Sequence, residues 1–342
     1  MKHTAGVRLI DQAEQCVAQP RVEPVHLRLI GVSLNGLLRR VRESNVPGYE
    51  REGSYKEIQR QLIIMIGMFD GLSSQEIVTL TGHEKAQVSR AIKPLEEAGL
   101  IERPRLRAKL TLCAKGRTLY NRLLSMSRAR DAMLTAGIPA ESLKRFAAMT
   151  DELTIMAAHL YTEERRRSAK VGFINPSASS LDLPSWPQGR RVKVPTTHLV
   201  TPKLISLAAY LNRSAMLVYQ RCEGLSHFQW QVLSRICDGS PMPLARLILD
   251  VGRDKSQVGR TVSHLETVDL ILRSRPTLRR DIVLEPTSRG MDVFRSMYDV
   301  GLEREAMLMS GFTGDEQAAY LACLDRLTDN AQQMLEQGAA PM

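Results

Sequence analysis

Three things are scarce in this sequence: patterned cysteine, long apolar runs and catalytic motifs. The five cysteines are scattered and form no CxxC pair, so neither a disulfide framework nor a cysteine metal site is predicted. No stretch reaches the roughly 18 uncharged apolar residues that a membrane-spanning helix needs, and the first residues lack the apolar core of a signal peptide. We therefore expect a cytoplasmic protein without a membrane partner.

Enzyme motifs are missing as well. The chain has no HExxH, no GxSxG and no glycine-rich phosphate loop, and its histidines are too dispersed to suggest a metal site. We expect no cofactor, no metal and no enzymatic activity.

What the chain does have is length and positive charge. Its 342 residues, 43% of them hydrophobic, suffice for two ordinary domains. Lysine and arginine outnumber aspartate and glutamate by 47 to 37, which favours an acidic partner, either nucleic acid or an anionic membrane surface. Charge alone does not choose between the two.

The sequence repeats itself at a shift of 170 residues. Lys85-Ala86-Gln87-Val88-Ser89-Arg90 aligns with Lys255-Ser256-Gln257-Val258-Gly259-Arg260. After the segment 103–110 the shift becomes 174, so that Phe146 aligns with Tyr320. A length change confined to one short segment is typical of a surface hairpin. We infer a duplicated domain, with copies at 1–162 and 197–342 and a Pro/Ser/Arg-rich linker at 163–196.

Each copy contains the pattern of a helix-turn-helix followed by a wing. In the first copy Ser73 and Glu76 form a capping box that predicts a short helix, Gly82 allows a tight turn, and a second helix is predicted over 84–98, ending at Gly99. The segments 100–103 and 109–112 are short enough to be the strands of a hairpin. Their counterparts are 270–275 and 281–284.

Longer helices flank each helix-turn-helix. In the first copy they are predicted over 27–42, 117–135 and 141–164, the last with apolar residues at alternating three and four spacing that suits packing against another helix. The fold class predicted is mainly α with small β-wings (α+β), namely two tandem winged helix-turn-helix units with long dimerisation-type helices.

This order of elements resembles the MarR family of bacterial regulators. The segment 111–117 (TLCAKGR) is similar to the family's connection from wing to dimerisation helix, and 286–290 (PTSRG) matches it in the second copy. The resemblance covers nearly the whole chain outside the linker. Members of the family are usually short chains that dimerise through their terminal helices, so a fused pair departs from the common pattern.

The face of each second helix that is opposite its apolar stripe is predicted to read DNA. Gln87 suits a paired contact with adenine and Arg90 one with guanine or a phosphate. The alternative is the solvated face of any surface helix, but the repetition of Lys-x-Gln-Val-x-Arg favours DNA. The predicted reading residues are Lys85, Gln87, Ser89, Arg90 and Lys93 in the first copy and Lys255, Ser256, Gln257 and Arg260 in the second.

The two wings are rich in arginine. Cationic hairpins follow phosphates or place an arginine in the minor groove, although charge also protects edge strands from aggregation. By resemblance to the family, Arg279 or Arg280 is the minor-groove arginine. The predicted wing contacts are Arg103, Arg105, Arg107 and Lys109 in the first copy and Arg273, Arg275, Arg279 and Arg280 in the second.

The two reading helices differ at two positions. Pro94 lies inside the first and predicts a kink or a shortened reading segment. In the second, Gly259 replaces Ser89, which suggests a close approach of DNA or of another helix.

Regulation is predicted from two features. Cys113, near several basic residues at a helix start, suits a thiol of lowered pKa that acts as an oxidation switch, although a buried small residue is the simpler interpretation. The resemblance to the family implies Cys16 as the alternative, because oxidant-sensing members carry the reactive cysteine near the N-terminus. The family often releases DNA when a phenolic or carboxylic ligand binds between the dimerisation helices and the DNA-binding lobe. The resemblance therefore implies a small aromatic or carboxylate effector. Its binding site would be lined by 28–39, 197–210 and the starts of the post-wing helices.

The function expected is that of a sequence-specific DNA-binding transcription regulator, a repressor in type. Its two copies would pair as an intrachain pseudo-dimer on double-stranded DNA, with reading helices about one DNA turn, roughly 34 Å, apart. Because the copies are unequal, the pseudo-palindromic operator should have unequal halves. A dimer of chains with four reading units is the rival assembly. A winged-helix module for protein interaction or for chromosome organisation or replication is the alternative function.

Overall fold

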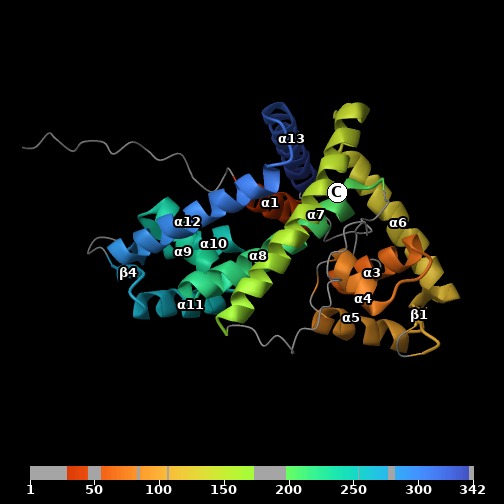
Figure 1. Cartoon of the computed structure of the whole chain (residues 1–342), viewed down its shortest axis with the longest axis horizontal. Coiled ribbons are helices and arrows are strands. Elements are labelled where there is room, and N and C mark those ends of the chain that lie inside the picture. The colour runs from red at the N-terminus through yellow and green to blue at the C-terminus, as the bar shows by residue number, and fades with distance from the viewer. Residues whose placement is uncertain are drawn as a thin grey trace, which may run out of the picture.

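The chain folds into two small lobes attached to one central body of long helices (Figure 1). The structure is a computed structural model, and it describes residues 29–44, 55–81, 83, 85–105, 108–172, 198–252, 254–275 and 282–338. It is mainly α with small antiparallel sheets, as the sequence predicts. The described part of the chain contains no helix long and apolar enough to cross a bilayer.

The first lobe contains α3 (Glu57–Met68), α4 (Ser74–Thr81), α5 (Lys85–Glu97), β1 (Ile101–Glu102) and β2 (Thr111–Leu112). The predicted capping box is confirmed, because the Glu76 amide donates to the Ser73 hydroxyl and the Ser73 amide donates to the Glu76 carboxylate. The lobe has its own core, to which Leu62, Ile77 and Leu95 belong.

The second lobe contains α9 (His227–Gly239), β3 (Met242–Pro243), α10 (Leu244–Val251), α11 (Lys255–Thr267), β4 (Ile271–Ser274) and β5 (Val283–Pro286). Its three-stranded sheet has the order β3-β5-β4, and β3 was not predicted. The corresponding position in the first lobe is a single bridge between Leu72 and Leu110. The lobe closes over a separate core that includes Val232, Val258 and Leu284.

The central body is built from six long helices taken from both halves of the chain. They are α1 (Ile30–Glu43), α6 (Ala114–Leu134), α7 (Ala140–Lys170), α8 (Val200–Glu223), α12 (Ser288–Met309) and α13 (Gly314–Gly338). Buried residues of these helices, among them Leu34, Leu153, Leu204 and Leu324, form one cluster. The order of elements in 30–170 recurs in 200–338, and the two halves share this core.

One predicted boundary is wrong. α7 does not end near Glu164 but continues to Lys170, into the segment that was predicted as linker. The reason is burial: Glu164 and Ser168 lie against α8 and are nearly inaccessible, and the Arg221 guanidinium donates to both Glu164 carboxylate oxygens. A helix whose face is buried in this way continues where composition suggests a loop. The remainder of the predicted linker, 173–196, lies outside the described residues.

The first helix of each half begins against a carboxylate of the other half. The Ile30 amide, at the start of α1, donates to Glu305 of α12 at 2.9 Å. The Val200 amide, at the start of α8, donates to Asp131 of α6 at 2.9 Å, and Thr201 adds two further bonds to Asp131. Each carboxylate satisfies a backbone donor that a helix start leaves unpaired. The two halves are therefore connected in both directions.

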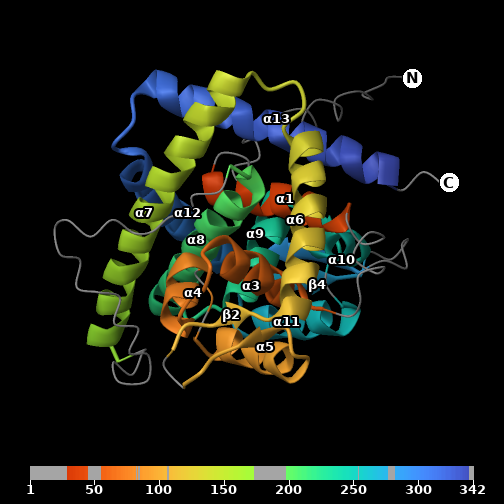
Figure 2. The ribbon, with the colours of Figure 1, turned by 90° about the vertical axis from the view of Figure 1, so that its right-hand side faces the viewer.

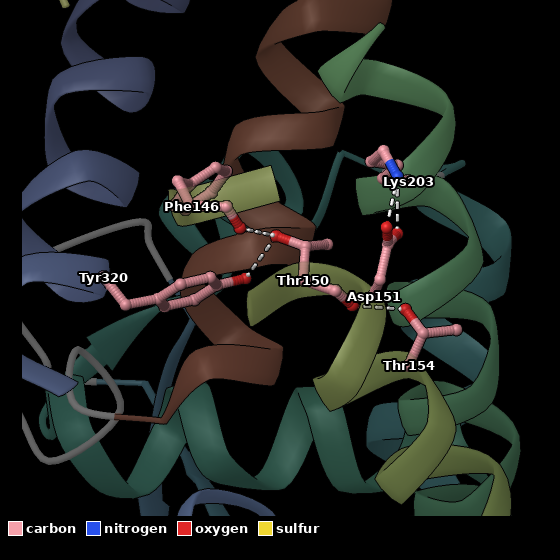
Figure 3. A network of polar contacts seen from close by, with 6 residues as sticks. All are labelled: Phe146, Thr150, Asp151, Thr154, Lys203 and Tyr320. Carbon is pink, nitrogen blue, oxygen red and sulfur yellow. Dashed lines mark hydrogen bonds and ion pairs between the residues drawn. The ribbon is translucent and has the colours of Figure 1, made fainter. Parts of the chain in front are cut away.

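A stacked ring pair joins α7 and α13 within the central body (Figure 3). The rings of Phe146 and Tyr320, which occupy equivalent positions of the sequence repeat, lie 4.5 Å apart at an angle of 18°. The Tyr320 and Thr150 hydroxyls are 3.2 Å apart, and Thr150 donates to the Phe146 carbonyl. In a two-fold interface, residues near the axis meet their own counterparts. The pair has that geometry within a single chain.

Candidate nucleic-acid interface

The exposed face of α5 carries the residues predicted to read DNA in the first half. Val88, Ile92 and Leu95 are buried in the lobe. The opposite face is exposed and presents Lys85, Gln87, Ser89, Arg90 and Lys93. Lys93 forms a loose ion pair with Glu97 at 3.9 Å, and both side chains are in water, where such a pair contributes little. The face is thus polar, cationic and accessible.

The exposed face of α11 is built in the same way. Val258, Val262 and Leu265 are buried, and the residues that face solvent include Lys255, Ser256, Gln257 and Arg260. The Asp254 carboxylate caps the helix by accepting from the Ser256 and Gln257 amides at 2.9 and 3.1 Å. The sequence reasoning missed this cap, although an aspartate directly before a helix is a recognisable signal.

Two positions distinguish the reading helices. α5 is continuous through Pro94 and has the same length as α11, 13 residues, so the helix is not shortened; the alternative expectation, a kink, stays a prediction. At Gly259 a Cβ atom would meet nothing within 4 Å. No described helix packs closely against this position, and a close approach of DNA stays a prediction.

One arginine at the base of each wing is held by the reading helix. Arg103 lies 2.8 Å from Glu96 of α5, and Arg273 lies 3.3 Å from Glu266 of α11. The two pairs occupy equivalent positions of the repeat. In this geometry both arginines connect the wing to the helix, and their contact with DNA stays a prediction.

The remaining wing residues fall into two groups. Arg105, Lys109 and Arg275 are exposed and stay candidates for phosphate contact. Arg107, Arg279 and Arg280 lie outside the described residues.

Both reading helices lie on the same side of the molecule. In Figure 1 and in the perpendicular view of Figure 2, α5 and α11 lie along the edge opposite α13. One surface of the chain therefore presents both predicted DNA-reading faces.

A cavity of about 310 Å³ separates the second lobe from the central body. It lies between α1, α8, α9 and α12, and its wall is aromatic: Tyr219 and Trp230 stack at 5.3 Å, and Trp230 and Phe294 at 5.9 Å. The predicted contribution of α1 is correct. The α8 residues that line the cavity come after Tyr210, and those of α12 come from the middle and end of the helix rather than its start.

Two charged residues of this cavity, Arg304 and Glu305, have pKa values that are shifted by burial. Burial lowers the pKa of the Arg304 guanidinium, because its charged form has lost water. Burial also raises the pKa of the Glu305 carboxyl to about 7, although the bond from Ile30 opposes the rise. Arg39 and Arg235 line the same space. The cavity is therefore lined by three arginines and by two carboxyl groups, those of Asp250 and Glu305.

The cysteine prediction fails on its chemistry. Desolvation and the nearby Glu102 raise the pKa of the Cys113 thiol, so the predicted lowered pKa is wrong. Cys16 lies outside the described residues. No group of three or more metal-ligating side chains occurs within the described part of the chain.

Comparison with known proteins identifies the first lobe. Residues 56–108, which span α3 to the wing, match the sequence model of the MarR family. A search of curated proteins found no match. The match to the MarR family is therefore shown for this segment of the first lobe.

Several solved structures are similar over one domain's length. The crystal structure of MarR is 29% identical, with 36% of this chain and 88% of that chain covered and a TM-score of 0.33. PcaV from Streptomyces coelicolor, crystallised with its natural ligand, is 24% identical, with 36% and 90% covered and a TM-score of 0.30. A putative MarR family regulator from Listeria monocytogenes, complexed with 26mer DNA, is 21% identical, with 40% and 93% covered and a TM-score of 0.34.

Proposed function

We propose that this chain is a DNA-binding transcription regulator of repressor type, in which two winged helices of one molecule occupy one operator as an intrachain pseudo-dimer. The observation that carries the proposal is the pair of exposed reading faces on one side of a core shared by both halves. The equivalent positions of Arg90 and Arg260, both exposed, suit base or phosphate contact. The stacked Phe146 and Tyr320 support the two-fold arrangement.

The operator is proposed to be imperfectly symmetric. The first reading helix presents Ala86 and Ser89 where the second presents Ser256 and Gly259, and the wing strands are longer in the second lobe. Random-sequence selection should therefore yield a site whose halves differ. Selection of a perfect palindrome would contradict pairing within one chain.

The DNA-binding test compares two matched arginines with a distant one. Each of Arg90→Ala and Arg260→Ala should weaken operator binding about tenfold, since one good base contact contributes about 1 to 3 kcal/mol. Arg145→Ala is the control, because Arg145 is exposed on α7, away from the reading helices, and pairs with Glu141 of the same helix. Binding is measured in a salt titration, and unchanged affinity in both variants would favour a winged-helix interaction module instead.

The assembly test combines light scattering with footprint length. A monomer that protects one pseudo-palindrome supports the proposal. A dimer of chains that protects two such sites contradicts it.

The effector proposed is a small aromatic carboxylate in the cavity beside the second lobe. The stacked wall of Tyr219, Trp230 and Phe294 suits a planar ring, and a volume of about 310 Å³ lies at the lower end of ligand sites. Arg304, whose cation is poorly solvated, suits the carboxylate. Occupation of the cavity would change how the lobe sits on the central body and so release DNA.

The ligand test uses Trp230 as reporter in a Trp186→Phe background, which leaves Trp230 as the remaining tryptophan. Benzoate should change its emission, and neutral benzamide should bind about tenfold more weakly, equal to about 1.4 kcal/mol. Arg304→Gln should remove that preference without abolishing benzamide binding. Equal binding of the two probes would contradict the carboxylate assignment.

A further inference from the structure

Each lobe accepts a hydrogen bond from the central body at an equivalent backbone carbonyl. The donor is a short side chain at the first lobe and a long one at the second. At the first lobe the Ser206 hydroxyl of α8, from the second half, donates to the Leu80 carbonyl at 2.8 Å. At the second lobe the Arg39 side chain of α1, from the first half, donates to the Asp250 carbonyl at 3.3 Å. Leu80 and Asp250 are counterparts at the repeat shift of 170. A serine reaches only a neighbouring helix, whereas an arginine spans a gap, so α8 lies closer to the first lobe than α1 lies to the second.

Three glycines lie beside the gap at the second lobe. Gly31 and Gly36 of α1 and Gly301 of α12 line the cavity. A Cβ at Gly31 would have its nearest contact at 4.0 Å, so the space beside it is open, whereas a Cβ at Gly36 or Gly301 would approach the Arg40 or Leu29 side chain to 3.3 or 3.2 Å. Side chains at the three positions would therefore take up space in the seam between α1, α12 and the second lobe.

The equivalent positions beside the first lobe carry hydroxyl side chains. Gly31, Gly36 and Gly301 correspond to Thr201, Ser206 and Ser127. All three hydroxyl residues are buried, with 3%, 2% and 4% of their surface exposed. Thr201 is bonded to Asp131 and Ser206 to Leu80. Glycines that border a cavity at the second lobe are thus replaced by buried hydroxyl residues at the first.

The three glycines and the three hydroxyl residues therefore make the two seams different, although the two halves have the same order of helices. A buried polar side chain that is hydrogen-bonded resists separation of the surfaces it connects, because opening would leave its partner unpaired until water enters. The second seam has no such bond at Gly36, where the Arg39 side chain of α1 contacts the lobe. On its other side the lobe contacts α8 and α12 through the stacked rings of Tyr219, Trp230 and Phe294.

We infer that the two lobes have different roles: the first is a fixed anchor locked to the central body, and the second is the movable lobe, with one effector site per chain. The regulatory part of this inference rests on the proposed function. The mechanical part, locked against movable, does not, because it follows from the seams alone. An effector that enters the cavity beside the second lobe would then reposition α11 while α5 stays in place.

Hydrogen exchange on the full-length chain, without ligand or DNA, tests the mechanical part. Protection factors in α10 should be at least about tenfold lower than in α4, the equivalent helix. Ser206→Ala should lower protection in α4 by about tenfold and leave α10 unchanged. Gly36→Ser, which introduces into α1 the residue that α8 carries at Ser206, should raise protection in α10.

The outcomes separate the inference from the proposed function. Equal protection of α4 and α10, or no effect of Ser206→Ala on α4, overturns the inference even if the chain represses transcription. The unequal protection, if found, supports it even if benzoate and operator DNA do not bind. In a binding titration, a saturating ratio of one benzoate per chain supports the single site and a ratio of two overturns it. Should Gly36→Ser fail to fold, Gly36→Ala serves as the smaller change.

Discussion

Asp131 and Glu305 are counterparts in the repeat, yet they face unequal surroundings. Asp131 accepts three hydrogen bonds, from the Val200 and Thr201 amides and from the Thr201 hydroxyl. Glu305 accepts from the Ile30 amide and lies at the edge of the cavity, where burial raises its pKa to about 7. The same position of the repeat therefore makes a strong connection from α6 to α8, through Asp131, and a weaker one from α12 to α1, through Glu305.

The largest effect is expected at Asp131. Asp131→Ala should lower the free energy of unfolding by about 3 kcal/mol, because it leaves two buried amides of the first turn of α8 unpaired. Thr201→Val, which removes one of the three bonds at nearly constant shape, should cost about 1 kcal/mol. Urea denaturation measures both. If Asp131→Ala lowers the free energy of unfolding no more than Thr201→Val does, Asp131 is not the stronger connection between the halves.

A smaller and pH-dependent effect is expected at Glu305. Its pKa is higher in the folded chain, about 7, than the ordinary value of 4.5, so proton binding favours folding. The stabilising contribution is present below about pH 4.5 and is lost as the pH rises through about 7. Glu305→Gln, which stays neutral, should therefore unfold less readily than the parent at pH 8, by on the order of 2 kcal/mol.

The control for this prediction is Glu303→Gln, an exposed position on the same helix. It should leave the pH profile of urea denaturation unchanged. If Glu305→Gln has the same profile as the parent between about pH 5 and pH 8, the difference between the two carboxylates is not one of burial.

The smallest effect is expected at the wing bases. Arg103 and Glu96 are closer and less exposed, at 24% and 28% of their side chains, than Arg273 and Glu266, at 30% and 41%. A double-mutant cycle should give a coupling of about 0.5 to 1 kcal/mol for the first pair and less for the second. High salt should shrink both values, and a stronger second pair would reverse the ranking of the halves.

Sequence reasoning predicted the features that depend on local pattern. The burial of Val88, Ile92 and Leu95 follows from helical spacing, and the capping box at Ser73 follows from two residue types three apart. Both are confirmed. The sequence repeat also aligns Phe146 with Tyr320, and the two rings stack in the structure. Patterns of this kind are encoded within a few turns of a helix.

The features that depend on distant contacts could not be read in advance. The end of α7 at Lys170 is set by burial of Glu164 and Ser168 against α8, which no local pattern specifies. The cavity depends on small residues in α1 and α12, and their effect emerges only when those helices are neighbours. The DNA contacts of the reading and wing residues stay predictions.

The shared core has a consequence for dosage. A regulator that pairs by association loses its two-headed form on dilution, and its operator occupancy then falls with the square of its concentration. Here the residues that meet across the core, such as Leu34 of α1 and Leu324 of α13, belong to one covalent chain, so their effective concentration is fixed by the polypeptide. On the proposed assembly, a single molecule is a complete reader, and occupancy should follow chain number linearly down to a few copies per cell.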